Sequence, residues 1–148
     1  MPTLLVIDDE EGVRYSFTYV YGGDTTVLTA ATAADGLRQI KEQAPDVVVL
    51  DLQLPDRNGL DLFKDIQALD RKRPVIFITA HGTTQTAIDA MKRGAFDYLV
   101  KPVDFEAMRD LLLRAFEAAR LMQIPAVLPS LEPSDRIVGR SPVMQEMC

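Results

Sequence analysis

Cysteine, tryptophan and long apolar runs are scarce in this chain of 148 residues. There is no tryptophan, and because Cys148 is the single cysteine, no disulfide can form within the chain and no metal site can be built on cysteine. No apolar run approaches the roughly 20 residues that a membrane-spanning helix needs. The first apolar run lacks the basic flank of a signal peptide and continues directly into Asp8 and Asp9. A chain without disulfides is compatible with a reducing compartment, and we expect a cytoplasmic protein without a membrane partner.

Clustered positive charge is also scarce. The formal net charge is −6, whereas binding to nucleic acid needs a basic face that neutralises phosphates. The densest basic group is the triplet 71–73, and such a lone triplet is typical of a solvated helix end. We therefore expect no nucleic-acid partner for this segment itself.

Four short apolar runs are present, and each leads into a polar residue: aspartate in two cases, threonine in one and lysine in one. Runs 4–7, 47–50, 75–78 and 96–100 lead into Asp8 and Asp9, Asp51, Thr79 and Lys101 respectively. Continuous runs of this length, separated by helical patterns, are typical of parallel strands buried on both faces. Ligands of open α/β sheets bind outside the carboxyl ends of the strands, so we expect these polar side chains to converge.

The whole pattern predicts an α/β fold in which strands and helices alternate. We expect a (βα)5 doubly wound parallel five-stranded sheet, flavodoxin-like, with an extended C-terminal helix. The predicted strands are at about 3–8, 25–29, 46–51, 74–79 and 96–100, and the predicted helices at about 12–21, 33–43, 59–69, 84–93 and 104–123.

The last predicted helix is longer than a sheet of five short strands needs as cover. Asp104 is its expected N-cap, and Ile124-Pro125 ends it near Gln123. Two apolar stripes run along it. Either the helix faces the core and frays at its end, or its second half forms a subunit interface; the sequence leaves both open.

The converging groups suit a metal and a phosphoryl group. Asp8, Asp9 and Asp51 with Lys101 sum to a charge of −2, which one divalent cation would balance. With only hard oxygen ligands on offer, Mg²⁺ is the natural occupant. Lys101 and Thr79 can bind phosphoryl oxygens while Asp51 attacks as the nucleophile. The alternative is that each residue is a turn or helix cap.

Four sequence blocks carry a family resemblance over about residues 3–122. The chain resembles the receiver domains of bacterial response regulators in Val6-Ile7-Asp8-Asp9-Glu10, in 49–59, in Ile78-Thr79-Ala80-His81-Gly82 and in 96–102. The resemblance implies that a sensor histidine kinase phosphorylates Asp51 and that Lys101 and Thr79 bind the phosphoryl group. It also implies that Asp8, Asp9, Asp51 and the Gln53 backbone carbonyl hold Mg²⁺.

The same resemblance suggests a switch. Thr79 and Tyr98 occupy the family's switch positions, where phosphorylation draws the hydroxyl inward and the aromatic ring follows; otherwise Tyr98 is an ordinary strand aromatic. The Lys101-Pro102 bond resembles the family's cis peptide. His81 is a poor candidate for a phosphoryl relay, because a Thr-Ala-His-Gly loop is usual in part of the family.

The C-terminal stretch indicates a subfamily. We expect residues 1–123 to form the receiver with its long helix and residues 124–135 to form a proline-rich linker. Residues 136–148 are similar to the beginning of the AAA+ ATPase domain of sigma-54-dependent activators of the nitrogen-regulatory type. We expect a piece of a larger regulator, with DNA bound through a missing C-terminal domain; a stand-alone receiver with a disordered tail is the alternative. A homodimer is expected through the last helix or through the face of the fourth helix and fifth strand.

Two other classes of function remain to be weighed. An aspartyl-phosphate phosphatase of the haloacid dehalogenase type needs an acid two residues after the nucleophile, where this chain has Gln53. A flavodoxin-like nucleotide carrier needs a phosphate-cradling loop, but residues 8–11 are all acidic. We expect a signalling switch rather than an enzyme; a receiver that assembles without phosphorylation is the remaining alternative.

Overall fold

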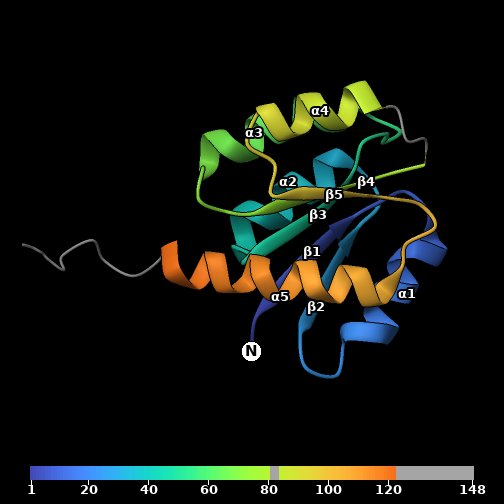
Figure 1. Cartoon of the computed structure of the whole chain (residues 1–148), viewed down its shortest axis with the longest axis vertical. Helices are drawn as coiled ribbons and strands as arrows, with labels where there is room; N and C mark the ends of the chain where they lie inside the picture. Colours follow the sequence, from blue (N-terminus) through green and yellow to red (C-terminus); the bar gives the residue numbers. More distant parts are fainter. Residues whose placement is uncertain (81–83, 123–148) are drawn as a thin grey trace, which may run out of the picture.

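A computed structural model describes residues 1–80 and 84–122 (Figure 1). In these residues a five-stranded sheet has the order β2-β1-β3-β4-β5, and every neighbouring pair is parallel. The strands are β1 (Thr3–Ile7), β2 (Thr26–Ala30), β3 (Val47–Asp51), β4 (Val75–Thr79) and β5 (Asp97–Val100). The helices are α1 (Glu11–Tyr21), α2 (Ala33–Gln43), α3 (Gly59–Leu69), α4 (Thr84–Lys92) and α5 (Phe105–Met122).

The helices cover the sheet on both faces, with α2, α3 and α4 on one side and α1 and α5 on the other (Figure 1). Successive side chains of a strand point to opposite faces of the sheet, so each strand contributes to the core layers on both sides. Leu5 and Ile7 of β1 pack with α2 and α3, while Leu4 and Val6 pack with α1 and α5, and all four are fully buried. This double burial explains why the strands are continuous apolar runs and confirms the predicted fold class.

The predicted element bounds agree with the structure to within a residue or two. The start of β2 differs for a visible reason. The Thr25 amide donates to Tyr21 O (3.1 Å), so it closes the end of α1 and the strand begins at Thr26.

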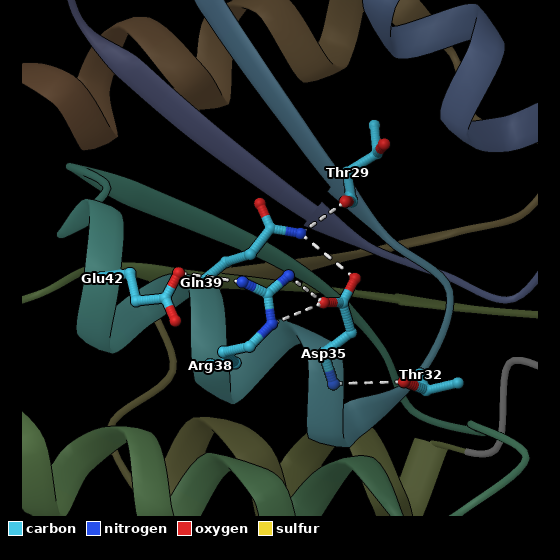
Figure 2. Close-up of polar contacts among 6 residues, drawn as sticks. All are labelled: Thr29, Thr32, Asp35, Arg38, Gln39 and Glu42. Carbon is cyan, nitrogen blue, oxygen red and sulfur yellow. Dashed lines mark hydrogen bonds and ion pairs between the residues drawn. The ribbon is translucent and has the colours of Figure 1, made fainter.

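Helix α2 is held by polar contacts at its start and along one side (Figure 2). Thr32 Oγ1 accepts a hydrogen bond from Asp35 N (3.1 Å), as an N-cap should. Gln39 Nε2 donates to Thr29 O (2.7 Å) and so ties the helix to β2, while Arg38 forms ion pairs with Asp35 and Glu42. The helix is therefore anchored to the sheet edge as well as packed on it.

Helix α5 changes character along its length. Asp104 caps it as predicted, with Oδ1 accepting from Glu106 N at 2.9 Å. The inner face is buried as far as Ala119, but Leu121 and Met122 are 53% and 55% exposed. The first part of the helix therefore belongs to the core, and its last turn presents apolar side chains to solvent. The predicted linker at 124–135 and the ATPase opening at 136–148 lie outside the described residues.

Candidate functional site

The carboxyl edge of the sheet collects the polar residues that end the strands. Asp8 follows β1, Asp51 and Thr79 are the last residues of β3 and β4, and Lys101 follows β5. Carboxylate oxygens of Asp8, Asp9 and Asp51 all lie within 4.8 Å of one another. The convergence predicted from the sequence is therefore present in the structure.

Lys101 connects the acidic groups. Its Nζ lies 3.0 Å from Asp8 Oδ2 and 3.1 Å from Asp51 Oδ2. Its backbone amide donates to Thr79 O at 2.7 Å, so the lysine is fixed to the end of β4 as well. Nζ also donates to Glu10 Oε1 at 2.9 Å, a contact that the sequence analysis missed. The only signal for it was a third acid directly after Asp8 and Asp9.

Burial makes the charges of this site strongly coupled. The side chains of Asp8, Asp51 and Lys101 are 0%, 6% and 13% exposed. Burial is the largest influence on Asp8 and raises the pKa of its carboxyl, although the Glu10 amide and Lys101 oppose it. Burial also lowers the pKa of Lys101, but its contacts with Glu10, Asp8 and Asp51 outweigh burial and raise that pKa above its ordinary value. One cation thus compensates two buried carboxylates.

One oxygen of Asp8 is incompletely satisfied. Asp8 Oδ1 accepts from Glu10 N (2.8 Å), whereas the buried Oδ2 makes no hydrogen bond within the described residues and has only the ion pair with Lys101. A buried carboxylate oxygen has room for a second partner besides this ammonium. Together with exposed Asp9 and buried Asp51 it forms a set of hard oxygen donors, so the residues present fit a divalent cation such as Mg²⁺.

The loop between β3 and α3 is ordered by several polar contacts. Gln53 N donates to Asp51 Oδ1 (3.0 Å), and Gln53 forms an antiparallel bridge with Asn58. Asp56 reaches a different element, accepting from Ala33 N (2.8 Å) and Ala34 N (3.0 Å) at the start of α2. The Ala33 amide, followed by that of Ala34, lowers the pKa of Asp56. The sequence analysis placed Gln53 near the site but missed the role of Asp56.

Access to the site is open from the side of α1. A cavity of about 800 Å³ reaches Lys101, and its lining includes Glu10, Gly12, Ser16, Ala80 and Phe105. A reacting group carried by a larger molecule could therefore approach Lys101 from outside.

The two predicted switch residues lie on neighbouring strands. Thr79 is buried and pairs in register with Val100, while Tyr98 is partly buried and pairs with Phe77. The Tyr98 side chain packs against the core layer shared by α2, α3 and α4. The Lys101-Pro102 peptide is cis. His81, considered above as a relay, lies outside the described residues.

Comparison with known proteins identifies the relatives of this arrangement. Residues 4–113 match the family described as "Response regulator receiver domain". The transcriptional regulatory protein ZraR of Escherichia coli K12 is 34% identical over 97% of this chain, and the DNA-binding transcriptional regulator NtrC of the same organism is 33% identical over 96%. These alignments span about a third of each relative's length (33% and 30%). The predicted resemblance to regulators of the nitrogen-regulatory type is confirmed.

Solved structures agree. A response regulator receiver domain protein from Clostridium thermocellum superimposes with a TM-score of 0.79 at 33% identity, covering 83% of this chain and all of the other. NtrX from Brucella abortus, crystallised in complex with ADP, gives a TM-score of 0.80 at 30% identity, covering 90% of this chain and 31% of NtrX. No helix in residues 1–80 or 84–122 is long and apolar enough to cross a membrane.

Proposed function

Since the chain belongs to the response regulator receiver domain family, we propose that it accepts a phosphoryl group on Asp51 from a sensor histidine kinase and acts as a signalling switch. The observation that carries this proposal is the contact of Lys101 Nζ with both Asp8 and Asp51 at the open carboxyl edge. That arrangement puts a nucleophilic carboxylate beside a fixed cation and an accessible cavity.

In the proposed reaction, a carboxylate oxygen of Asp51 attacks the phosphorus of a phosphohistidine. The new O–P bond forms as the N–P bond breaks, and the imidazole, protonated on its other ring nitrogen, leaves as the neutral base. Lys101 and the Thr79 hydroxyl bind phosphoryl oxygens and stabilise their charge. Loss of the phosphoryl to water would return the switch to its resting state.

Asp8, Asp9, Asp51 and the Gln53 carbonyl are the proposed ligands of Mg²⁺. When bound, Mg²⁺ supplies charge neutralisation at the phosphoryl oxygens. Asp8 Oδ2 supports this assignment, because its only partner among the described residues is the Lys101 ammonium and it lies in the acidic cluster with Asp9 and Asp51. Lys101 keeps Asp8 and Asp51 close together before the cation arrives.

The proposed output is a population shift between two conformations. Phosphoryl oxygens draw Thr79 inward, Tyr98 moves into the space, and the face of α4 and β5 changes. This face already exposes Ile88, Met91 and Val100. Either this face or the exposed end of α5 with Leu121 and Met122 is a proposed surface for homodimer formation.

For the wider protein, we propose control of a sigma-54-dependent AAA+ activator. Residues 124–135 would link the receiver to an ATPase domain whose sequence begins within 136–148, and a further domain would bind DNA. The resemblance of these residues and the similarity to NtrC and ZraR support the proposal.

Intact-protein mass spectrometry tests the central step. The chain and an Asp51→Asn variant would each be incubated with acetyl phosphate, with and without Mg²⁺. We expect one added phosphoryl group that depends on Mg²⁺ and is absent from the variant. If the parent chain stays unmodified while calorimetry shows that it binds Mg²⁺, the phospho-accepting role is wrong and the chain is an assembly element.

A further inference from the structure

Asp56 binds an element other than its own. It lies in the loop between β3 and α3, yet its two carboxylate oxygens accept hydrogen bonds from Ala33 N and Ala34 N at the start of α2. The amides of a first helical turn have no partner inside the helix and carry its positive dipole end, so a carboxylate suits them. Because Asp56 is exposed, these two hydrogen bonds rather than burial fix its position.

The element that Asp56 binds is a rigid support. Helix α2 is tied to β2 by the hydrogen bond from Gln39 to Thr29 O (Figure 2). It also packs closely on β1, since a Cβ added at Gly36 would lie 2.5 Å from Ile7 Cδ1. A loop attached to this helix end is therefore held relative to the sheet.

The other end of the loop carries the Gln53 main chain. Gln53 N donates to Asp51 Oδ1, the Gln53–Asn58 bridge closes the loop, and Gly59 N donates to Leu52 O at 2.8 Å. These contacts stay within the β3–α3 unit, so none of them ties the loop itself to α2. The Asp56 contact adds the connection to a separate element, three residues after Gln53.

We propose that Asp56 is a positioning residue of the phosphoryl-acceptor site, because it fastens the β3–α3 loop to α2 and so fixes where the Gln53 carbonyl points. This inference rests on the proposed function, in which that carbonyl is a ligand of Mg²⁺. Asp56 itself touches neither the cation nor the phosphoryl group. Its effect passes through the backbone of residues 53–56.

A simple helix cap would have the same contacts but different consequences. Thr32 offers the matched control, because its hydroxyl caps the same end of α2 through Asp35 N and makes no recorded contact with the β3–α3 loop. If Asp56 only stabilised α2, Asp56→Ala and Thr32→Ala would have equal effects on the metal site. If it positions the loop, only the Asp56 variants should change that site.

The test is Mg²⁺ binding by titration calorimetry on the full chain and on Asp56→Ala, Asp56→Asn and Thr32→Ala, at a temperature where circular dichroism shows each to be folded. We expect Asp56→Ala to weaken Mg²⁺ binding roughly tenfold, as loss of a group that orients a ligand does. Asp56→Asn should weaken it less, and Thr32→Ala should stay within about twofold of the parent. Hydrogen exchange of the Gln53 amide should accelerate in Asp56→Ala alone.

Equal Mg²⁺ affinity in the parent and both Asp56 variants would overturn the inference, and so would an equal loss in Asp56→Ala and Thr32→Ala. The proposed function fails separately: in that case the parent chain itself binds no Mg²⁺ or takes no phosphoryl from acetyl phosphate. Asp56→Asn keeps the test available should Asp56→Ala not fold.

Discussion

The two edges of the sheet use charged residues in opposite ways. At the amino edge two charged side chains bind the backbone: Asp46 accepts from Thr3 N at 2.8 Å, and Arg73 Nε donates to Pro45 O at 2.7 Å. At the carboxyl edge two buried carboxylates share one ammonium, and a buried Asp8 oxygen has no hydrogen bond among the described residues.

This difference separates stability from function. Backbone contacts at the amino edge close the ends of strands and loops, so each adds to stability. The crowded carboxylates at the other edge oppose folding unless a divalent cation binds there. Neutralising an acid should therefore have opposite effects on stability at the two edges, and removing a cation should destabilise the carboxyl edge more than the amino edge.

The largest effect is expected from Lys101. Lys101→Met leaves Asp8 and Asp51 buried without their cation, and we expect the free energy of unfolding in EDTA at neutral pH to fall by about 3 kcal/mol. Arg73→Met at the amino edge removes one hydrogen bond and should lower it by about 1 kcal/mol or less. Urea unfolding followed by circular dichroism measures both. Equal losses would mean that the two edges do not differ in this way.

Replacing one glycine at each edge tests how closely the backbone is packed there. A Cβ at Gly59 would lie 2.6 Å from Asp51 O and 2.8 Å from Leu52 Cα, so Gly59→Ala should lower the free energy of unfolding by about 2–3 kcal/mol and weaken Mg²⁺ binding. Gly94, at the amino edge, has φ +105°, and Gly94→Ala should lower it by about 1–2 kcal/mol through backbone strain.

Thermal unfolding and Mg²⁺ titration of both glycine variants measure these changes in stability and in Mg²⁺ affinity. Mg²⁺ affinity should change in Gly59→Ala alone. A loss of affinity in Gly94→Ala would show that the amino edge is coupled to the site.

Neutralising an acid should change the free energy of unfolding in opposite directions at the two edges. Asp8→Asn removes a buried charge and its repulsion with Asp51, so we expect the metal-free protein to gain about 1–2 kcal/mol in free energy of unfolding while losing stabilisation by Mg²⁺. Asp46→Asn weakens the contact with Thr3 N and should lower the free energy of unfolding by up to about 1 kcal/mol. Unfolding in EDTA and in Mg²⁺ gives both signs, and a loss in metal-free Asp8→Asn would contradict the contrast.

The smallest effect concerns the aromatic contact between α1 and α5, which lies away from both edges. Tyr21 OH donates to Phe105 O (2.6 Å), and burial raises the pKa of Tyr21 from 10.0 to about 12. Because the folded-state pKa is the higher one, this stabilisation is complete below pH 10 and is lost as the pH rises through about 12.

Tyr21→Phe should lower the free energy of unfolding by about 1 kcal/mol at pH 7. Between pH 10 and 12 its stability should decline less steeply than that of the parent, as urea unfolding across this range would show. A steeper decline in the variant would mean that Tyr21 does not contribute to the alkaline loss.

Residue patterns predicted the elements and the composition of the site because both depend on local order. A strand that is buried on both faces must be apolar, and the residue after it falls at the sheet edge whatever the details. Asp8, Asp51, Thr79 and Lys101 were found in this way.

Pairings between distant residues were not predicted, because they depend on how the loops pack. Glu10 meets Lys101 across 91 positions, and Asp56 meets Ala33 across 23. Neither residue differs in sequence from an ordinary solvated acid. The incomplete hydrogen bonding of Asp8 Oδ2 likewise appears only once every neighbour is placed.

The acidic cluster around Asp8 has a consequence for how long the folded chain survives. A ligand that binds only the folded state shifts the unfolding equilibrium by mass action, and at ten times its dissociation constant the shift is about 1.4 kcal/mol. Divalent cations that bind the Asp8, Asp9 and Asp51 cluster would therefore decide how large a fraction of molecules is open to proteases. The same cluster would then affect resistance to proteolysis as well as reactivity.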